Sequence, residues 1–218
     1  AIVEIIKQFY EGLGLWGKHW VSLSIRDPKT PEAYIGEPKD WEAAEKMLQK
    51  VSDKYSLKAV KMEGEAALYG PKLDFMFKDA LGRETQLATI QLDFAMPKRF
   101  GLSYTDKDGS DKNPVMIHRA ILGSFERFMM LLIEHFAGAF PLWLAPEQVR
   151  VIPISDKFKG YAQKVAERLQ KEGIRVFLDD DSESLGKRIR NGEKLKVPII
   201  MVVRSEEHTS ELQSLRHL

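Results

Sequence analysis

The order of the expected strands and helices changes once along this chain, near Pro141 and Pro146. Between residues 73 and 120, strand-like segments follow one another through short turns, which predicts an antiparallel sheet. Beyond Pro146, strand-like and helix-like segments alternate, which favours a mostly parallel sheet. The sequence therefore predicts an α+β fold: a partial antiparallel sheet with packed helices, followed by a short, truncated α/β domain.

Hydrophobic periodicity and turn residues locate the elements of the first part. Helices are expected at about residues 2–12, 40–51 and 124–136, with Asp40 capping the second of them. Strands are expected at about residues 19–25, 58–62, 73–77, 84–94 and 115–120. Residues 97–104 continue the strand meander, and Asp106–Lys112 forms a polar turn.

The second part is expected to hold strands at 148–154, 174–178 and 198–203 and helices at 158–171 and 185–195. We place the first domain at residues 1–143 and the second at residues 144–203. Residues 204–218 are polar and without periodicity, and they resemble the translation of a common sequencing adapter. We expect this tail to be non-native; the alternative is a short native C-terminal tail.

Composition excludes several classes of protein. The chain is 44% hydrophobic and 30% charged, which is typical of a globular domain, and apolar runs such as Phe128–Ile133 are too short to span a membrane. With no secretory leader in view, we expect a cytoplasmic protein without a membrane partner. The absence of cysteine excludes disulfides and thiolate metal ligands from these 218 residues, and a net charge of +1 neither requires nor excludes nucleic acid.

The most informative stretch runs from Pro114 to Phe128, where a short strand leads into a helix. It places His118, a possible metal ligand, on the strand, and it places Arg127 in the first turn of the helix. A cation there is unfavourable by roughly 0.3–1 kcal/mol, because a helix N-terminus already carries positive partial charge. Arg127 is therefore either held for an anion or is an ordinary surface arginine, and spacing alone does not decide between them.

The segment Pro114–Ser124, PVMIHRAILGS, resembles motif 3 of the class II aminoacyl-tRNA synthetases, in the form typical of the threonyl-tRNA synthetase family. Three further strings resemble the same family: Leu68–Phe75, Thr89–Phe94 and Phe140–Val149. They occur in the family's order, and the resemblance covers about residues 1–203. The second domain is then similar to the family's anticodon-binding domain.

The resemblance implies a role for each matching residue. His118 matches a zinc ligand, and the family's other two ligands, a cysteine and a histidine, would lie upstream of residue 1. Arg127 and Lys72 match residues of the activation chemistry. Positions matching ATP contacts are Gln86, Thr89, Ser124 and Arg127. Tyr69 and Gln91 match positions beside the amino acid, where the Gln91 amide would meet the substrate carboxylate or amine.

The family activates threonine with ATP and Mg²⁺ and transfers it to tRNA(Thr), and its complete enzymes are expected to be homodimers. Its motifs 1 and 2 would precede residue 1, so we expect a C-terminal fragment that is inactive alone. The alternative from another class is a non-catalytic, synthetase-like RNA-binding or regulatory paralogue. A prolyl or other related synthetase fits the His-Arg-Ala-Ile-Leu-Gly-Ser form less well.

Three further features bear on the site. Asp74, Asp93 and Glu126 are interpreted as orienting or salt-bridging residues rather than as acid–base catalysts. Leu87-Ala88 stands where the family often has Cys-Gly or Cys-Ala, which changes the expected shape of the threonine pocket. A basic stretch at helical spacing is either a solvated helix face or a tRNA phosphate contact; it comprises Lys187, Arg188, Arg190, Lys194 and Lys196.

Overall fold

A computed structural model describes residues 1–204 and 213–214 of the chain. Its contacts divide the chain into two compact units, Ala1–Leu131 and Leu132–Leu218. The expected α+β fold is confirmed, whereas the domain boundary at residue 143 stays a prediction. Most of the tail predicted to be non-native lies outside the described residues. In the part that is described, no helix is both long and apolar enough to cross a membrane.

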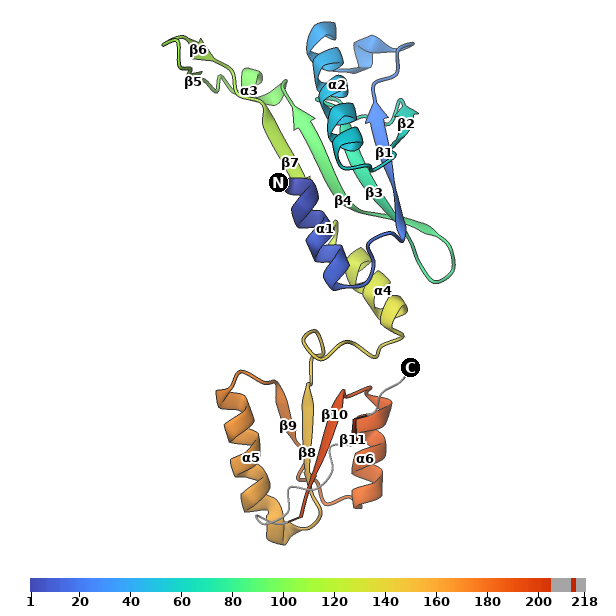
Figure 1. The fold of residues 1–218 in the computed structure, drawn as a ribbon, viewed down its shortest axis with the longest axis vertical. Coiled ribbons are helices and arrows are strands. Elements are labelled where there is room, and N and C mark those ends of the chain that lie inside the picture. The colour runs from blue at the N-terminus through green and yellow to red at the C-terminus, as the bar shows by residue number, and fades with distance from the viewer. Residues whose placement is uncertain (205–212, 215–218) are drawn as a thin grey trace. The chain divides into compact units, whose positions relative to one another are not determined.

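A five-stranded sheet forms the centre of the first unit (Figure 1). Its order is β2 (Val60–Glu63), β1 (His19–Ile25), β3 (Lys72–Lys78), β4 (Glu84–Asp93) and β7 (Met116–Ala120). Within residues 73–120 the pairs β3–β4 and β4–β7 are antiparallel, as predicted. The pair β1–β3 is also antiparallel, whereas β1 and β2 are parallel. The exception follows from the connection, because a helix lies between β1 and β2 and a crossover of that length returns the chain in the same direction.

The long helices of this part of the chain are α1 (Ile2–Gly12), α2 (Pro38–Lys54) and α4 (Phe125–Phe136). The expectation that Asp40 caps α2 is wrong: the helix starts at Pro38, and Asp40 lies in its first turn. Proline suits the first helical position because its missing N–H has no partner there in any case. Residues 31–33 form a 3₁₀ turn, η1 (Pro31–Ala33).

The prediction that residues 97–104 continue the strand meander is wrong for the first residues of this segment, which are helical. The short helix α3 (Met96–Arg99) begins there instead, because the Asp93 carboxylate accepts hydrogen bonds from the backbone N–H groups of Ala95 and Met96, at 3.0 and 2.9 Å. A side-chain oxygen that satisfies these N–H groups favours a helix start over an extended strand.

The two faces of the sheet differ in chemistry. On one face, Phe77 of β3 stacks on Tyr10 of α1 with ring centroids 4.4 Å apart, and Leu23 and Phe75 are also buried. Alternation along β3 turns Lys72 and Asp74 to the opposite face. The helix-covered face is therefore the core of the unit, and the other face carries polar side chains.

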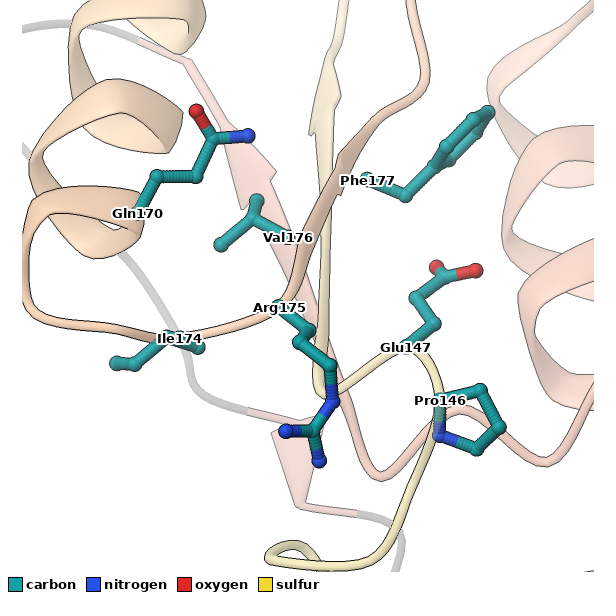
Figure 2. Close-up of a pocket in the computed structure, with 7 residues that line it drawn as sticks. All are labelled: Pro146, Glu147, Gln170, Ile174, Arg175, Val176 and Phe177. Atoms are coloured by element: carbon teal, nitrogen blue, oxygen red, sulfur yellow. The ribbon is translucent and has the colours of Figure 1, made fainter.

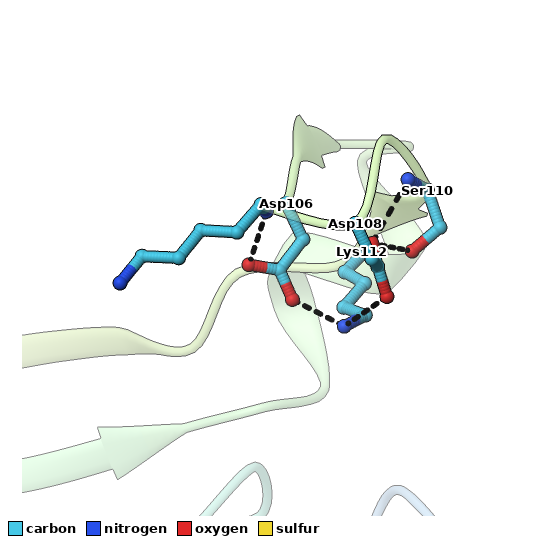
Figure 3. Close-up of polar contacts among 5 residues, drawn as sticks. Asp106, Asp108, Ser110 and Lys112 are labelled. Carbon is cyan, nitrogen blue, oxygen red and sulfur yellow. Dashed lines mark hydrogen bonds and ion pairs between the residues drawn. The ribbon is translucent and has the colours of Figure 1, made fainter.

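The predicted polar turn is a small hairpin between β5 (Tyr104–Thr105) and β6 (Asp111–Lys112). The Lys112 ammonium bonds the carboxylate of Asp106 and lies 3.3 Å from Asp108 Oδ2, while Ser110 donates to Asp108 Oδ1 through both its N–H and its hydroxyl (Figure 3). The hydrogen bond from Lys112 lowers the pKa of Asp106. These contacts close the turn on itself.

The second unit alternates strands and helices, as predicted. Its elements are β8 (Val149–Pro153), η2 (Asp156–Phe158), α5 (Lys159–Lys171), β9 (Val176–Leu178), α6 (Leu185–Lys194), β10 (Ile199–Val203) and β11 (Gln213–Ser214). The sheet order is β11-β10-β8-β9; β8 is parallel to both β9 and β10, and β11 is antiparallel to β10. Val151, Ala162 and Ala166 are buried where α5 covers the sheet.

Charged side chains are also buried in the second unit. Arg150 donates to both carboxylate oxygens of Glu147, at 2.7 and 2.9 Å, and lies 3.3 Å from Asp179 Oδ2. Arg188 is 5% exposed and donates to the carbonyl oxygens of Asp179 and Pro153, at 2.9 and 2.8 Å. Arg188 therefore belongs to the interior, unlike the exposed Lys187 and Arg190 of the same basic stretch.

An open groove of about 450 Å³ lies beside β9, lined by Pro146, Glu147, Gln170, Ile174, Arg175, Val176 and Phe177 (Figure 2). The Arg175 guanidinium donates to the carbonyl oxygens of Trp143 and Ala145. Glu147 is engaged by Arg150, whose guanidinium also lies over the Phe177 ring. The charged groups of the groove thus hold the chain entering β8 against β9.

Candidate functional site

Strand pairing places three predicted site residues side by side across the polar face of the first sheet. Lys72 of β3 pairs with Gln91 of β4, and Gln91 pairs with His118 of β7. Directly paired residues on neighbouring strands project from the same face. Lys72, Gln91 and His118, which we call the polar row, therefore form one line although up to 46 positions separate them in the sequence.

A buried carboxylate holds the histidine of the polar row. His118 Nε2 lies 2.9 Å from Asp93 Oδ2; the Asp93 side chain is 1% exposed, and that of His118 is 41% exposed. Because the other oxygen of Asp93 is fixed by two backbone N–H groups, this carboxylate is a rigid acceptor. A histidine whose Nε2–H donates to a carboxylate keeps Nδ1 with a lone pair, which is the usual arrangement of a metal-binding imidazole.

The Tyr69-Gly70-Pro71-Lys72 segment lies directly against β4. The Tyr69 hydroxyl donates to Gln91 Oε1 at 2.9 Å, and its ring lies 5.6 Å from the His118 ring. A Cβ at Gly70 would come within 1.6 Å of the Leu92 carbonyl oxygen, so only glycine permits this close approach. Gly70 thereby seats Tyr69 over the polar row.

Asp74 is the second buried carboxylate of this face, at 3% exposed. Its Oδ1 accepts hydrogen bonds from Gln86 Nε2 at 2.8 Å and from Thr89 Oγ1 at 2.6 Å, and its Oδ2 lies 2.6 Å from Lys72 Nζ. These contacts support the interpretation of Asp74 and Asp93 as orienting or salt-bridging residues.

A β-bulge brings Gln86 to this site. Asp74 pairs with Thr89, but Met76 pairs with Gln86, so β4 has one extra residue at Leu87-Ala88. In a regular strand, residues three positions apart face opposite sides, and the bulge restores Gln86 and Thr89 to the same side. Leu87 and Ala88 are both buried, at 1% and 0% exposed. The sequence did not predict the bulge, although the Gln86-x-x-Thr89 spacing on one strand required it.

Ser124 and Arg127 lie on a different segment, where β7 leads into α4. The Ser124 hydroxyl accepts a hydrogen bond from the backbone N–H of Arg127 at 3.2 Å and so caps the helix. Gly123 has a φ of +69°, and a Cβ there would lie 2.8 Å from the Leu87 carbonyl oxygen. This contact ties the start of α4 to the bulge, and the Arg127 side chain is exposed at that helix start.

The structure thus brings six of the predicted residues onto one face: Tyr69, Lys72, Gln86, Thr89, Gln91 and His118. Among the residues that the structure describes, no three His, Cys, Asp or Glu side chains form a group that could hold a metal ion. His118 is therefore a single candidate ligand whose tautomer suits a metal. Leu87, at the position that departs from the family pattern, is packed in the interior.

Comparison with known families gives two matches along the chain. Residues 2–136 match the family described as the tRNA synthetase class II core domain (G, H, P, S and T). Residues 148–218 match the family described as the anticodon binding domain. The first match includes every predicted site residue.

Individual relatives agree with these matches. A threonine–tRNA ligase from Gloeobacter violaceus is 52% identical over 215 residues, which are 99% of this chain and 34% of the relative. One from Thermus thermophilus is 46% identical over 99% of this chain and 32% of its own length. A crystal structure of the RNA binding domain of threonyl-tRNA synthetase from Cryptosporidium parvum superposes with a TM-score of 0.82 at 36% identity, over 94% of this chain and 50% of that one. The chain spans about a third of the length of the curated relatives.

Proposed function

The chain belongs to the class II aminoacyl-tRNA synthetases, and we propose that it is part of a threonine–tRNA ligase. In this reaction ATP activates threonine to threonyl-adenylate, and threonine is then transferred to tRNA(Thr). The observation that carries the proposal is the polar row with its two buried carboxylates, Asp74 and Asp93. Around it lie Gln86 and Thr89, which we propose for ATP, Tyr69 and Gln91, which we propose for threonine, and His118, which we propose for zinc.

We assign Gln91 to the substrate carboxylate rather than to the amine. The Tyr69 hydroxyl donates to Gln91 Oε1 and takes one of its two lone pairs, whereas the amide NH₂ carries two N–H donors and turns away from Tyr69, so the NH₂ is the group that we assign to the ligand. A carboxylate accepts such hydrogen bonds, whereas an ammonium group cannot. Tyr69 thus sets which end of threonine Gln91 recognises.

Activation requires the threonine carboxylate oxygen to attack the α-phosphorus of ATP while the bond to pyrophosphate breaks. Neither step needs a protein base, so the protein contributes positioning and charge neutralisation. Arg127 and Lys72 supply the positive charges, with Mg²⁺ accompanying the nucleotide. The exposed Arg127 guanidinium at a helix start suits a phosphate ligand.

His118 fits a zinc ligand in this proposal, because Asp93 occupies Nε2 and leaves Nδ1 to a metal. Zinc with open coordination positions would bind the amine and hydroxyl of threonine, a distinction that an apolar pocket makes poorly against valine. The other ligands would come from outside the residues that the structure describes. The proposed partners are tRNA(Thr), reached through the second unit, and a second copy of the complete enzyme.

The test is ATP–pyrophosphate exchange by the product of the longest open reading frame that contains this chain. We expect exchange with threonine, with far less for valine and proline, and threonylation of tRNA(Thr). Binding of tRNA without exchange would support the non-catalytic alternative, and a preference for proline would support the related-synthetase alternative. The 218-residue chain alone is expected to show no exchange, and threonine-dependent exchange by it would overturn that expectation.

A further inference from the structure

Asp74 is too deeply buried to touch a ligand, yet three side chains that are predicted to do so depend on it. Its carboxylate receives Gln86 and Thr89 on one oxygen and Lys72 on the other, all within 2.8 Å. A carboxylate that is ionised can only accept hydrogen bonds. Each of the three neighbours must therefore direct a donor inward, toward Asp74.

The contacts with Asp74 determine which atoms of Thr89 and Gln86 remain available for hydrogen bonds with a ligand. The Thr89 hydroxyl has one proton, and because it is committed to Asp74, only oxygen lone pairs remain for a ligand. The Gln86 amide directs its nitrogen to Asp74, so Oε1 is the atom turned away from it. Gln91, five residues along the same strand, has the opposite orientation, because its oxygen rather than its nitrogen bonds the neighbouring side chain, Tyr69.

Resting on the proposed function, we propose that Asp74 is a positioning residue that makes Gln86 and Thr89 acceptors for the ribose hydroxyls of ATP. Phosphate oxygens at neutral pH are themselves acceptors, and a buried carboxylate behind two acceptors disfavours them. The nucleoside has donors at the adenine amino group and at the ribose hydroxyls, and of these only the ribose presents two separate donor groups side by side, which matches a pair of acceptor side chains. The phosphates then fall to Lys72, which Asp74 holds in place, and to Arg127.

The experiment compares Asp74→Asn with the unaltered complete protein in threonine-dependent exchange, using ATP, 2′-deoxyATP and 3′-deoxyATP. In the unaltered protein at least one deoxynucleotide should have a KM about tenfold above that of ATP, the size expected for one lost hydrogen bond to a ribose hydroxyl. Asp74→Asn should raise the KM for ATP about tenfold and abolish this discrimination. An asparagine has a single acceptor oxygen, and the charged Lys72 ammonium attracts it more strongly than the neutral donors do, so the amide nitrogen, a donor, faces Gln86 and Thr89 and reverses their orientation.

Asp79→Asn is the matched control. Asp79 is also a buried aspartate, one residue beyond the end of β3, but its carboxylate is bonded to Arg83 and to the backbone N–H of Leu81, within a turn. This variant should lower the unfolding midpoint without changing nucleotide discrimination. A role for Asp74 in folding alone would make the two variants behave alike, and that result would overturn the proposal.

Thr89→Val and Thr89→Ser keep the test decisive if Asp74→Asn does not fold. Thr89→Val should lose the ribose discrimination, whereas Thr89→Ser, which retains the hydroxyl, should keep it. Equal KM values for ATP and both deoxynucleotides in the unaltered protein would refute the ribose assignment. Absence of any threonine-dependent exchange in the unaltered protein would instead count against the proposed ligase. In that event the 218-residue chain still tests the Asp74 contacts: the Gln86 side-chain NH₂ should lose its protection from hydrogen exchange in Asp74→Asn, and unchanged protection would overturn them.

Discussion

The first unit buries Asp74 and Asp93 beneath the polar face of its sheet, whereas the second unit buries Arg150, Asp179 and Arg188 among its strand ends. The aspartates of the first unit bond side chains that extend to the surface, such as His118 and Lys72. In the second unit, Arg188 bonds two backbone carbonyls, and Arg150 bonds Glu147 and Asp179. Buried charge thus orients partly exposed side chains in one unit and joins backbone segments in the other.

The largest expected effect is a loss of stability when Arg188, which bonds two backbone carbonyls, is replaced. Arg188→Ala leaves the carbonyls of Asp179 and Pro153 buried without donors, and each such group costs about 1–3 kcal/mol. We expect the free energy of unfolding of the second unit to fall by about 3 kcal/mol or more in urea denaturation. The exposed Lys187→Ala should change it by less than about 0.5 kcal/mol. Equal, small effects would place Arg188 on the surface with the rest of the basic stretch.

Gly70→Ala should have the next largest effect and should appear in the first unit. The added Cβ would overlap the Leu92 carbonyl oxygen, so the Tyr69–Lys72 segment must move away from β4 at a cost of about 1–3 kcal/mol. Gly12→Ala is the control, because a Cβ there meets nothing within 4 Å. The measurement is the unfolding midpoint together with Tyr69 ring contacts by NMR. An unchanged Tyr69 environment would show that Gly70 is not required to hold this segment against β4.

Tyr10→Phe tests a buried polar contact that does not serve the site. Burial raises the pKa of Tyr10, and its hydroxyl donates to the Ile121 carbonyl at 2.7 Å. Losing this bond should destabilise the first unit by about 0.5–1.5 kcal/mol. Tyr55→Phe removes an exposed hydrogen bond to Glu4 and should have a smaller effect on chemical denaturation. A larger loss of stability in Tyr55→Phe than in Tyr10→Phe would contradict the prediction that the buried hydrogen bond contributes more.

The smallest expected effect is a dependence on pH from His19. Burial among Trp16, Phe75 and Phe77 lowers the pKa of His19 in the folded state. Below about pH 6.5 the unfolded chain takes up a proton that the folded chain resists, so this contribution to stability is complete above that pH and is lost as the pH falls. His19→Gln should reduce the loss of stability between about pH 7.5 and about pH 5.5, on either side of the ordinary histidine pKa. An identical loss in both proteins would show that His19 does not contribute.

Most of the fold was predictable because it depends on local patterns. Alternation located β1 at its observed bounds, and the change of rhythm near Pro146 gave the parallel sheet. The parallel pairing of β2, the bulge at Leu87-Ala88 and the burial of Arg188 were not predicted, because each depends on which strands become neighbours. Arg188 has the same sequence pattern as its basic neighbours, and only the position of α6 against the strands of the second sheet distinguishes it.

The candidate site was also predictable only in part. The motif strings indicated His118, Gln91, Tyr69 and Lys72, and the strand register aligns them. The hydrogen-bond polarity of Gln86 and Gln91 was not predictable, because both are glutamines on one strand and differ only in their partners, Asp74 and Tyr69. The partners of the two glutamines therefore indicate whether the ligand must donate or accept a hydrogen bond, which the motif alone does not.

The polar row is tested most directly as a site of threonine recognition by the zinc coordination of the complete protein, measured by metal analysis and X-ray absorption. We expect one zinc ion per chain, bound by His118 through Nδ1, with Asp93 on Nε2. His118→Ala should remove the metal, and Asp93→Asn should weaken its binding by about 10–100-fold. Full zinc content in His118→Ala, or zinc bound away from this imidazole, would contradict the assignment of the polar row as the site of threonine recognition.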